Sequence, residues 1–140
     1  MSSIFHLAIP AGRLDITIPF YTKTLGCALG PFEKGKWQDV DFWGNELTLH
    51  ETSPRLNKGH ERERHSVEMG SVCVPHFGIH LDWDNYLKIK KRIEDQFVFL
   101  DAPYIRFEGK QTQQETFFVE DPNFNVLEIK SIQGSFYNND

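Results

Sequence analysis

Two histidines and one glutamate are the residues whose types and positions suggest chemistry in this sequence. Glu128 lies within the apolar run 126–129, where a buried carboxylate is costly unless a cation, a metal or hydrogen-bond donors compensate it. His6 and His76 each lie near the start of a stretch in which apolar residues alternate with others. Two imidazoles and one carboxylate form a facial triad, the ligand pattern of non-haem Fe(II) centres. We therefore predict that these three residues bind a divalent metal ion.

The identity of the fourth ligand is open among Glu46, His50 and water alone. Glu46 and His50 alternate with leucines, so both lie on one face of a predicted strand. Either residue is compatible with a place beside the triad. A lone histidine on a strand is more often a structural residue than a ligand, so the metal interpretation depends on the same pattern appearing in both halves of the chain.

The clearest structural signal is the strand pair that carries Glu128. Aromatic and β-branched residues fill 116–119, and a second apolar strand covers 126–129. Between them, Asp121-Pro122-Asn123 supplies turn chemistry, since the proline presets φ and its two neighbours can bond the turn backbone. Period-two alternation places Glu128 on the same face as Val126 and Lys130.

The chain repeats one order of elements twice. Each half begins with an apolar strand that carries a histidine, continues with a helix, and ends with strands. The predicted strands of the first half are 4–10, 37–43 and 46–51, with a loop through Gly30-Pro31. Those of the second half are 75–81, 104–107, 116–119 and 126–129, and 97–100 is a short strand or the approach to one. We predict an α+β fold of two βαβββ modules that form a curved mixed sheet around a metal-binding trough, with the helices outside.

The expected domain organisation is a single domain over residues 1–140. Module one covers about 1–53 and module two about 73–133. A polar, charge-rich linker covers about 54–72, and a short tail covers 134–140.

Composition excludes several classes of protein. The 140 residues are 39% hydrophobic and carry a formal net charge of −5, which argues against nucleic acid or an anionic membrane as the main partner. No apolar run approaches the roughly 18 residues of a membrane-spanning helix, and residues 1–10 lack the features of a signal peptide. We expect a cytoplasmic protein in which Cys27 and Cys73 are free thiols.

Several segments of the sequence resemble one known group of proteins. The resemblance covers nearly the whole chain and is carried by the segments 5–10, 19–27, 41–47, 75–82 and 118–128. On these segments the chain is similar to the vicinal oxygen chelate superfamily, which includes glyoxalase I, bleomycin-resistance proteins and extradiol dioxygenases. Within it, Arg106-Phe107-Glu108-Gly109 before Glu115-Thr116-Phe117-Phe118 resembles bacterial glyoxalase/dioxygenase-type proteins. Phe124 departs from the pattern, because relatives commonly have glycine there.

The resemblance implies roles for individual residues. His6 matches the ligand of the first strand, His76 the ligand that opens module two, and Glu128 the carboxylate of the last strand. The implied metal is Fe(II), with nickel, zinc or manganese as alternatives. His80 is then a candidate acid or base, and Tyr104 and Arg106 are candidates for binding an anionic or phenolic substrate, as is Glu115. Arg106 and Glu115 also have a structural interpretation as a cross-strand ion pair.

The resemblance also implies three alternative functions, each with a small-molecule partner. The first is a metal-dependent dioxygenase. The second is an isomerase, lyase or thiol transferase of the glyoxalase or fosfomycin-resistance type. The third is a non-catalytic protein that sequesters a small molecule. A homodimer is expected, because dimers are common in the superfamily.

Overall fold

The computed structural model describes residues 3–56, 63–67 and 70–132. The predicted tail and parts of the predicted linker lie outside these residues. The chain divides into two compact units. Unit 1 comprises Met1–Gly59 with Asp121–Asn125, and unit 2 comprises His60–Glu120 with Val126–Asp140.

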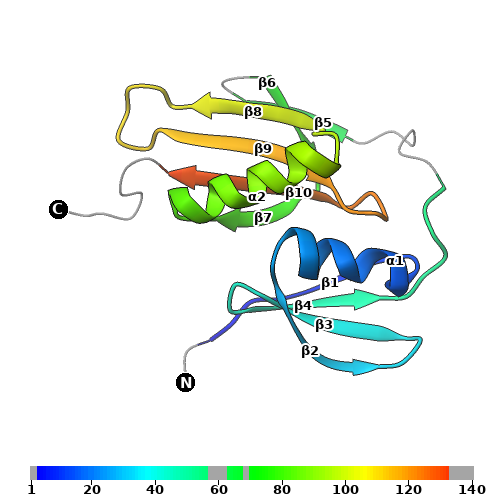
Figure 1. The fold of residues 1–140 in the computed structure, drawn as a ribbon. Coiled ribbons are helices and arrows are strands. Elements are labelled where there is room, and N and C mark those ends of the chain that lie inside the picture. The colour runs from blue at the N-terminus through cyan, green and yellow to red at the C-terminus, as the bar shows by residue number, and fades with distance from the viewer. Residues whose placement is uncertain (1–2, 57–62, 68–69, 133–140) are drawn as a thin grey trace. The chain divides into compact units, whose positions relative to one another are not determined.

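Unit 1 contains one four-stranded sheet with its helix. Its elements are β1 (His6–Pro10), α1 (Leu14–Pro19), the π-helical turn η1 (Phe20–Thr24), β2 (Ala28–Glu33), β3 (Trp37–Phe42) and β4 (Asn45–His50). The strands lie in the order β1-β4-β3-β2 (Figure 1). β1 and β4 are parallel, and the other pairs are antiparallel.

Unit 2 contains a second sheet of the same design. Its elements are β5 (Glu63–Val67), β6 (Gly70–Val74), β7 (Phe77–His80), α2 (Trp83–Gln96), β8 (Asp101–Arg106), β9 (Gln114–Glu120) and β10 (Val126–Ile132). The sheet order is β7-β10-β9-β8, and β7 and β10 form the parallel pair. The repeated order confirms the predicted α+β fold of two βαβββ modules.

Three strands lie where the sequence predicted none. β2 occupies the predicted loop through Gly30-Pro31; all its residues are exposed, and its pairing with β3 is irregular between Leu29 and Phe32. A proline is compatible with such an edge strand because its missing N–H faces away from the ladder. β5 lies within the predicted linker and β6 begins in it, and the two strands pair as a hairpin.

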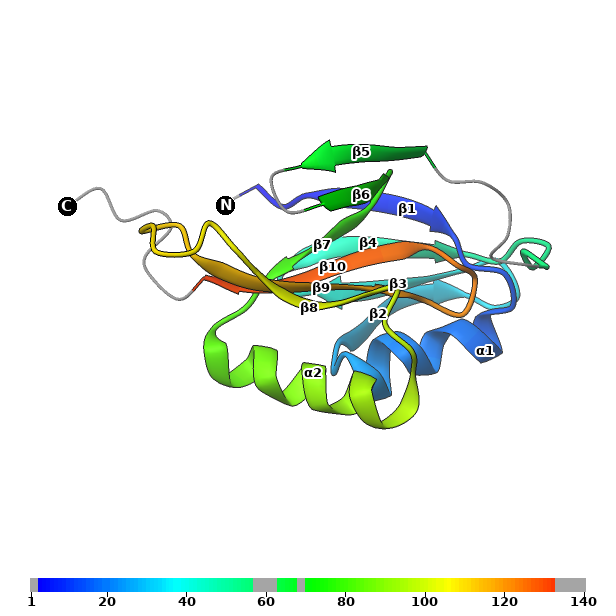
Figure 2. The same cartoon turned by 90° about the horizontal axis from the view of Figure 1, so that it is seen from above.

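The two faces of the second sheet have different coverings. On one face, α2 packs its buried residues Tyr86, Ile89 and Ile93 against the sheet (Figure 2). On the other face, Val72 and Cys73 of β6 form a cluster with Phe118 and Val126. The hairpin therefore covers the end of this face near Val126, which is the face that carries Glu128.

A polar contact inside the α2 packing leads to a stability prediction. The buried Tyr86 hydroxyl donates to Glu115 Oε2 at 2.7 Å, and Lys90 Nζ donates to the same oxygen at 2.9 Å. Tyr86→Phe is expected to lower the free energy of unfolding by about 1–2 kcal/mol, because it removes a hydrogen bond to a charged acceptor. Urea denaturation followed by circular dichroism measures this loss. Lys91→Met, which breaks the exposed Lys91–Asp95 pair, is the control and should show no measurable change; an equal loss in both variants would contradict the assignment.

The turn between β9 and β10 belongs to unit 1 and is fixed by one carboxylate. Asp121 accepts hydrogen bonds from the Tyr21 hydroxyl at 2.7 Å and from the backbone N–H groups of Asn123 and Asn125. The predicted role of Asp121 is thus confirmed, whereas the side chain of Asn123 bonds the backbone of Pro10 and Arg55 and not that of the turn. Phe124 takes a left-handed φ of 63°, which is the conformation that glycine adopts most easily.

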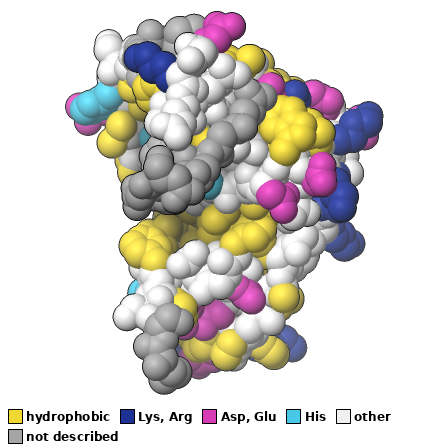
Figure 3. Space-filling view, turned by 90° about the vertical axis from the view of Figure 1, so that its left-hand side faces the viewer, with side chains coloured by type: hydrophobic (Ala, Val, Ile, Leu, Met, Phe, Trp, Pro, Cys, Tyr) yellow, Lys and Arg dark blue, Asp and Glu magenta, His cyan; other side chains and the backbone are white. Residues whose placement is uncertain are grey.

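The molecular surface is mixed in character. Large exposed hydrophobic side chains include Phe5 and Phe32, each 65% exposed. On the face in Figure 3, hydrophobic side chains are interspersed with acidic and basic ones. Among the described residues, no helix has both the length and the apolar character that crossing a membrane requires.

Candidate metal and substrate site

Unit 2 contains a histidine–glutamate pair that is a candidate for metal binding. His76 immediately precedes β7, and its Nε2 lies 3.4 Å from Oε1 of Glu128 on β10. The other ring nitrogen, Nδ1, contacts the carbonyl oxygen of Cys73. A carbonyl only accepts, so Nδ1 carries a proton, and Nε2 faces Glu128, to which it donates a hydrogen bond when the ring is protonated. A backbone carbonyl behind one ring nitrogen is the usual way in which proteins orient a metal-binding histidine.

Glu128 is surrounded by donors and cations. Thr116 Oγ1 donates to its Oε2 at 2.7 Å, Lys130 Nζ lies 3.5 Å from Oε1, and Arg106 lies 3.8 Å from Oε2. Burial, which leaves the residue 6% exposed, disfavours the charged carboxylate. The hydrogen bonds from His76 and Thr116 and the charge of Lys130 outweigh burial and lower the pKa of Glu128 to about 2. The carboxylate is therefore ionised at neutral pH, as a metal ligand must be.

The spacing of this pair fits a divalent ion. Two adjacent ligands with metal bonds of about 2.1 Å lie roughly 3 Å apart, close to the 3.4 Å between His76 Nε2 and Glu128 Oε1. Without a metal, the hydrogen bond with Glu128 raises the pKa of His76. A proton and a metal ion therefore compete for the same lone pair.

Unit 1 contains a similar pair. β1 and β4 run parallel with His6 beside Glu46, and His6 Nδ1 lies 2.7 Å from Glu46 Oε1. His50 lies on the same strand face but four residues further along, or about 13 Å at the rise of a strand. The structure thus brings Glu46, and not His50, to His6. Within either unit, the described residues include no group of three or more histidine, cysteine or acidic side chains able to hold one ion.

The registers of the two modules reveal an asymmetry. In module two, Gly78, two residues after His76, pairs with Glu128. In module one, Ala8, two residues after His6, pairs with Thr48. Thr48 therefore occupies the strand position equivalent to Glu128, and its hydroxyl donates to Asp39 at 2.6 Å. Glu46 contacts His6 from one step earlier on the same strand face.

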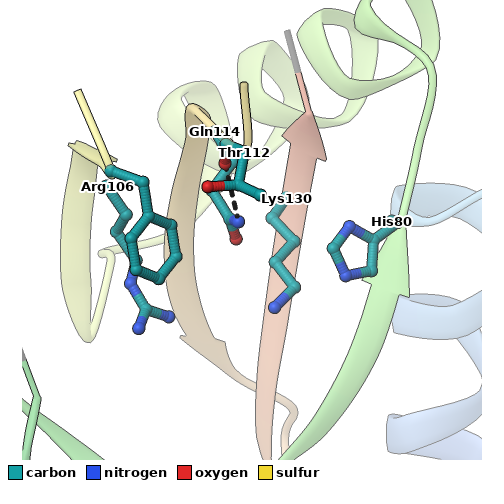
Figure 4. Close-up of a pocket in the computed structure, with 6 residues that line it drawn as sticks. His80, Arg106, Thr112, Gln114 and Lys130 are labelled. Atoms are coloured by element: carbon teal, nitrogen blue, oxygen red, sulfur yellow. Dashed lines mark hydrogen bonds between the residues drawn. The ribbon is translucent and has the colours of Figure 1, made fainter. Parts of the chain in front are cut away.

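A pocket is lined in part by Lys130 and Arg106, the two cations that contact Glu128. It has a volume of about 420 Å³ and is lined by His80, Arg106, Phe107, Thr112, Gln114 and Lys130 (Figure 4). Partial removal of His80 from water and the charge of Lys130 lower the pKa of this imidazole, which keeps it neutral at pH 7.

The other residues singled out from the sequence take different places. Tyr104 lies on β8, opposite Thr116 of β9, and is not among the residues that line the pocket. Glu115 lies on the α2 face, bonded to Tyr86 and Lys90, so its assignment to the substrate site and to an ion pair with Arg106 is wrong. The alternation that predicted the face of Glu128 also placed Lys130 on that face. This pattern was the signal that Lys130 lies beside Glu128.

Comparisons with known proteins agree with this fold. No protein-family model matches the chain. A structure described as a glyoxalase/bleomycin resistance protein/dioxygenase from Alicyclobacillus acidocaldarius is 31% identical, covers 94% of this chain and 92% of its own, and has a TM-score of 0.68. FosX, a fosfomycin resistance protein from Listeria monocytogenes, is 15% identical with a TM-score of 0.66, covering 97% of this chain and 96% of its own. The glyoxalase domain-containing protein RDO1 of Mycosarcoma maydis is 27% identical over 135 residues, which are 94% of this chain and 69% of that protein.

Proposed function

This chain belongs to the vicinal oxygen chelate superfamily of glyoxalase, bleomycin-resistance and dioxygenase proteins, and on that premise we propose that it is a divalent-metal-dependent enzyme acting on a small organic substrate, with a dioxygenase as the first candidate. The observation that carries the proposal is the His76–Glu128 pair. One ring nitrogen of the histidine is held by a backbone carbonyl, and the other is directed toward an ionised, buried carboxylate.

The residues that would hold the metal are His6, His76 and Glu128, with Glu46 beside His6 as a fourth candidate. Fe(II) suits two imidazoles and one carboxylate, and nickel, zinc or manganese are the alternatives. When bound, the metal would supply Lewis acidity and a template for adjacent substrate oxygens.

The remaining chemistry falls to residues of this chain. His80 is neutral at pH 7 and lines the pocket beside Lys130, so its imidazole is placed to accept or donate a substrate proton. Arg106 would orient an anionic substrate group through its planar donors. Tyr104, on the strand next to Thr116, is a further candidate for substrate positioning.

A second candidate function is favoured by the contact between His6 and Glu46. If both residues bind the metal, four protein ligands leave two positions of an octahedron for the substrate. That arrangement suits an isomerase, lyase or thiol transferase of the glyoxalase or fosfomycin-resistance type. We propose a cytoplasmic homodimer in either case, and light scattering coupled to size-exclusion chromatography measures the oligomeric state.

The decisive experiment compares the metal content of the wild-type protein, purified without added metal, with that of Glu128→Ala. We expect stoichiometric iron in the wild type, oxygen uptake with a panel of catechols, and at least a roughly 100-fold loss of metal affinity in the variant. Glu108→Ala, on an exposed loop, is the matched control and should retain the metal.

The other outcomes discriminate among the functions. Nickel, zinc or manganese without oxygen uptake would replace the dioxygenase with the second candidate. A metal-free protein that binds small molecules equally well with and without Glu128 would overturn both enzymatic functions and leave a sequestering protein.

A further inference from the structure

The pocket lined by Lys130 and Arg106 is built by all four strands of the second sheet. His80 comes from β7, Lys130 from β10, Gln114 from β9 and Arg106 from β8, and their side chains surround one space (Figure 4). Gln114 and Arg106 are paired across β9 and β8, and Lys130 and His80 across β10 and β7. Backbone pairing therefore sets these side chains next to one another. A volume of about 420 Å³ is within the range of small-molecule sites.

The charges around this pocket favour an anion. Lys130 and Arg106 contribute two positive charges, and the side chains of both are largely buried, with 21% and 13% exposed. Both contact one carboxylate, Glu128, which contributes a single negative charge. The residues that line the pocket include these two cations and no acidic side chain, so the lining itself is positively charged. A guanidinium beside an ammonium is a suitable receptor for a carboxylate.

Gln114 adds a second and independent indication. The residue is 2% exposed, and its Nε2 donates to the carbonyl oxygen of Thr112 at 3.2 Å. Its Oε1 is buried and has no hydrogen-bond partner within the described part of the chain. Buried side-chain oxygens in native proteins are nearly always paired, so an unpaired one next to a pocket calls for a donor. The missing donor would be a hydroxyl on the ligand.

Phe107 supplies an apolar wall and a strained backbone. Its ring lines the pocket and lies under the Arg106 guanidinium, 5.0 Å from the ring centroid. The residue takes a left-handed φ of 55°, which an aromatic residue seldom adopts. Such conformations persist where the surrounding structure requires them, often at ligand sites.

We propose that this pocket binds a small 2-hydroxycarboxylate with an apolar substituent. Lys130 and Arg106 would bind the carboxylate, Gln114 Oε1 would accept a hydrogen bond from the hydroxyl, and Phe107 would pack against the apolar group. The inference rests on the proposed function in so far as this ligand is the substrate of the Glu128 site, since it names the substrate class.

The test uses metal-free protein, prepared by chelation followed by desalting, and three probes of nearly equal size. Mandelate has the carboxylate and the hydroxyl, mandelamide lacks the charge, and phenylacetate lacks the hydroxyl. We expect calorimetry to show that mandelamide binds about tenfold or more weakly than mandelate, because a charge-assisted hydrogen bond is lost. Phenylacetate should bind about fivefold more weakly, because Gln114 then loses its donor. Added salt should weaken mandelate binding.

Two variants and one control locate the site. Lys130→Met should lower mandelate affinity about tenfold, and Gln114→Leu should remove the preference for mandelate over phenylacetate. Lys91→Met, an exposed lysine on α2, should leave both affinities unchanged. Equal affinity for mandelate and mandelamide in the wild type, or binding of mandelate weaker than about 10 mM, would overturn the proposal.

The calorimetric titration and the measurement of metal content test the two proposals independently. Because the protein is metal-free, anion binding is measured whether or not Glu128 later proves to be a metal ligand. Selective mandelate binding without any metal affinity would leave the pocket intact and reject the proposed metal enzyme. Metal binding without a preference for mandelate would support the proposed metal enzyme and reject the 2-hydroxycarboxylate as its ligand.

Discussion

Replacement of Gly78 by alanine is expected to lower the free energy of unfolding of unit 2 by about 3 kcal/mol or more. Gly78 lies on β7, opposite Glu128 of the parallel strand β10. A Cβ at Gly78 would overlap the backbone carbonyl of Glu128. Backbone atoms within a ladder cannot move aside as the end of a side chain can, so the two strands would have to separate.

The measurement is urea denaturation of the metal-free protein, and Gly30→Ala is the matched control. Gly30 lies on the edge strand β2, where the nearest atom to a new Cβ is Asp39 Cβ at 3.4 Å. This variant should lose less than about 1 kcal/mol. Equal losses in the two variants would show that the close approach of β7 to β10 is not what Gly78 provides.

The Gly78 position also has a consequence for the site. His76 lies two residues before Gly78, and its contact with Glu128 depends on how closely β7 approaches β10. Gly78→Ala is therefore expected to weaken metal binding as well as stability. A variant that unfolds more easily but binds metal as tightly as the wild type would show that metal binding does not depend on the close pairing of β7 with β10.

The alternation of side chains along the strands was the main signal from which the fold and the face of Glu128 could be predicted. Period-two patterns placed Glu128 on one face of its strand, and the structure confirms that Leu127 and Ile129 are buried on the other. Turn residues were equally informative, since Asp121 and Asn123 form the predicted turn. These signals are local, so a single sequence contains them.

Features that depend on partners in space were not predictable. β2 is exposed along its length and contains Gly30 and Pro31, so it lacks the apolar pattern by which strands are recognised. Glu115 was assigned to the substrate site because its chemistry suited it, although alternation with Thr116 already placed it on the opposite face. Its partners, Tyr86 and Lys90, are on a helix 25–29 residues away.

The choice between Glu46 and His50 shows the same limit. Both residues have the correct parity, and both side chains are acceptable metal ligands. Only the parallel register of β1 and β4, which sets His6 beside Glu46 and Pro10 beside His50, distinguishes them. Register between distant parallel strands is decided by packing of the whole module and not by any local signal.

In the metal-free protein, Glu128 is expected to make stability strongly dependent on pH. Its pKa falls from an ordinary value of 4.5 to about 2 in the folded state, because hydrogen bonds from His76 and Thr116 and the charge of Lys130 outweigh burial. A carboxylate with a lowered pKa stabilises the fold above the unfolded pKa, and this contribution is lost as the pH falls toward the folded pKa. The full contribution is about 3 kcal/mol, of which about 2 kcal/mol should be lost by pH 3.

The comparison of wild type with Glu128→Gln isolates this effect from other carboxylates. Urea denaturation at pH 7 and pH 3 should show that the stability difference between the two proteins shrinks by about 2 kcal/mol. Thr116→Val, which removes one donor to Glu128, should reduce this shrinkage, because the carboxylate then protonates at higher pH. Parallel pH profiles for wild type and Glu128→Gln would mean that Glu128 is not held by these partners. The ionised carboxylate on which the proposed metal site depends would then lose its physical basis.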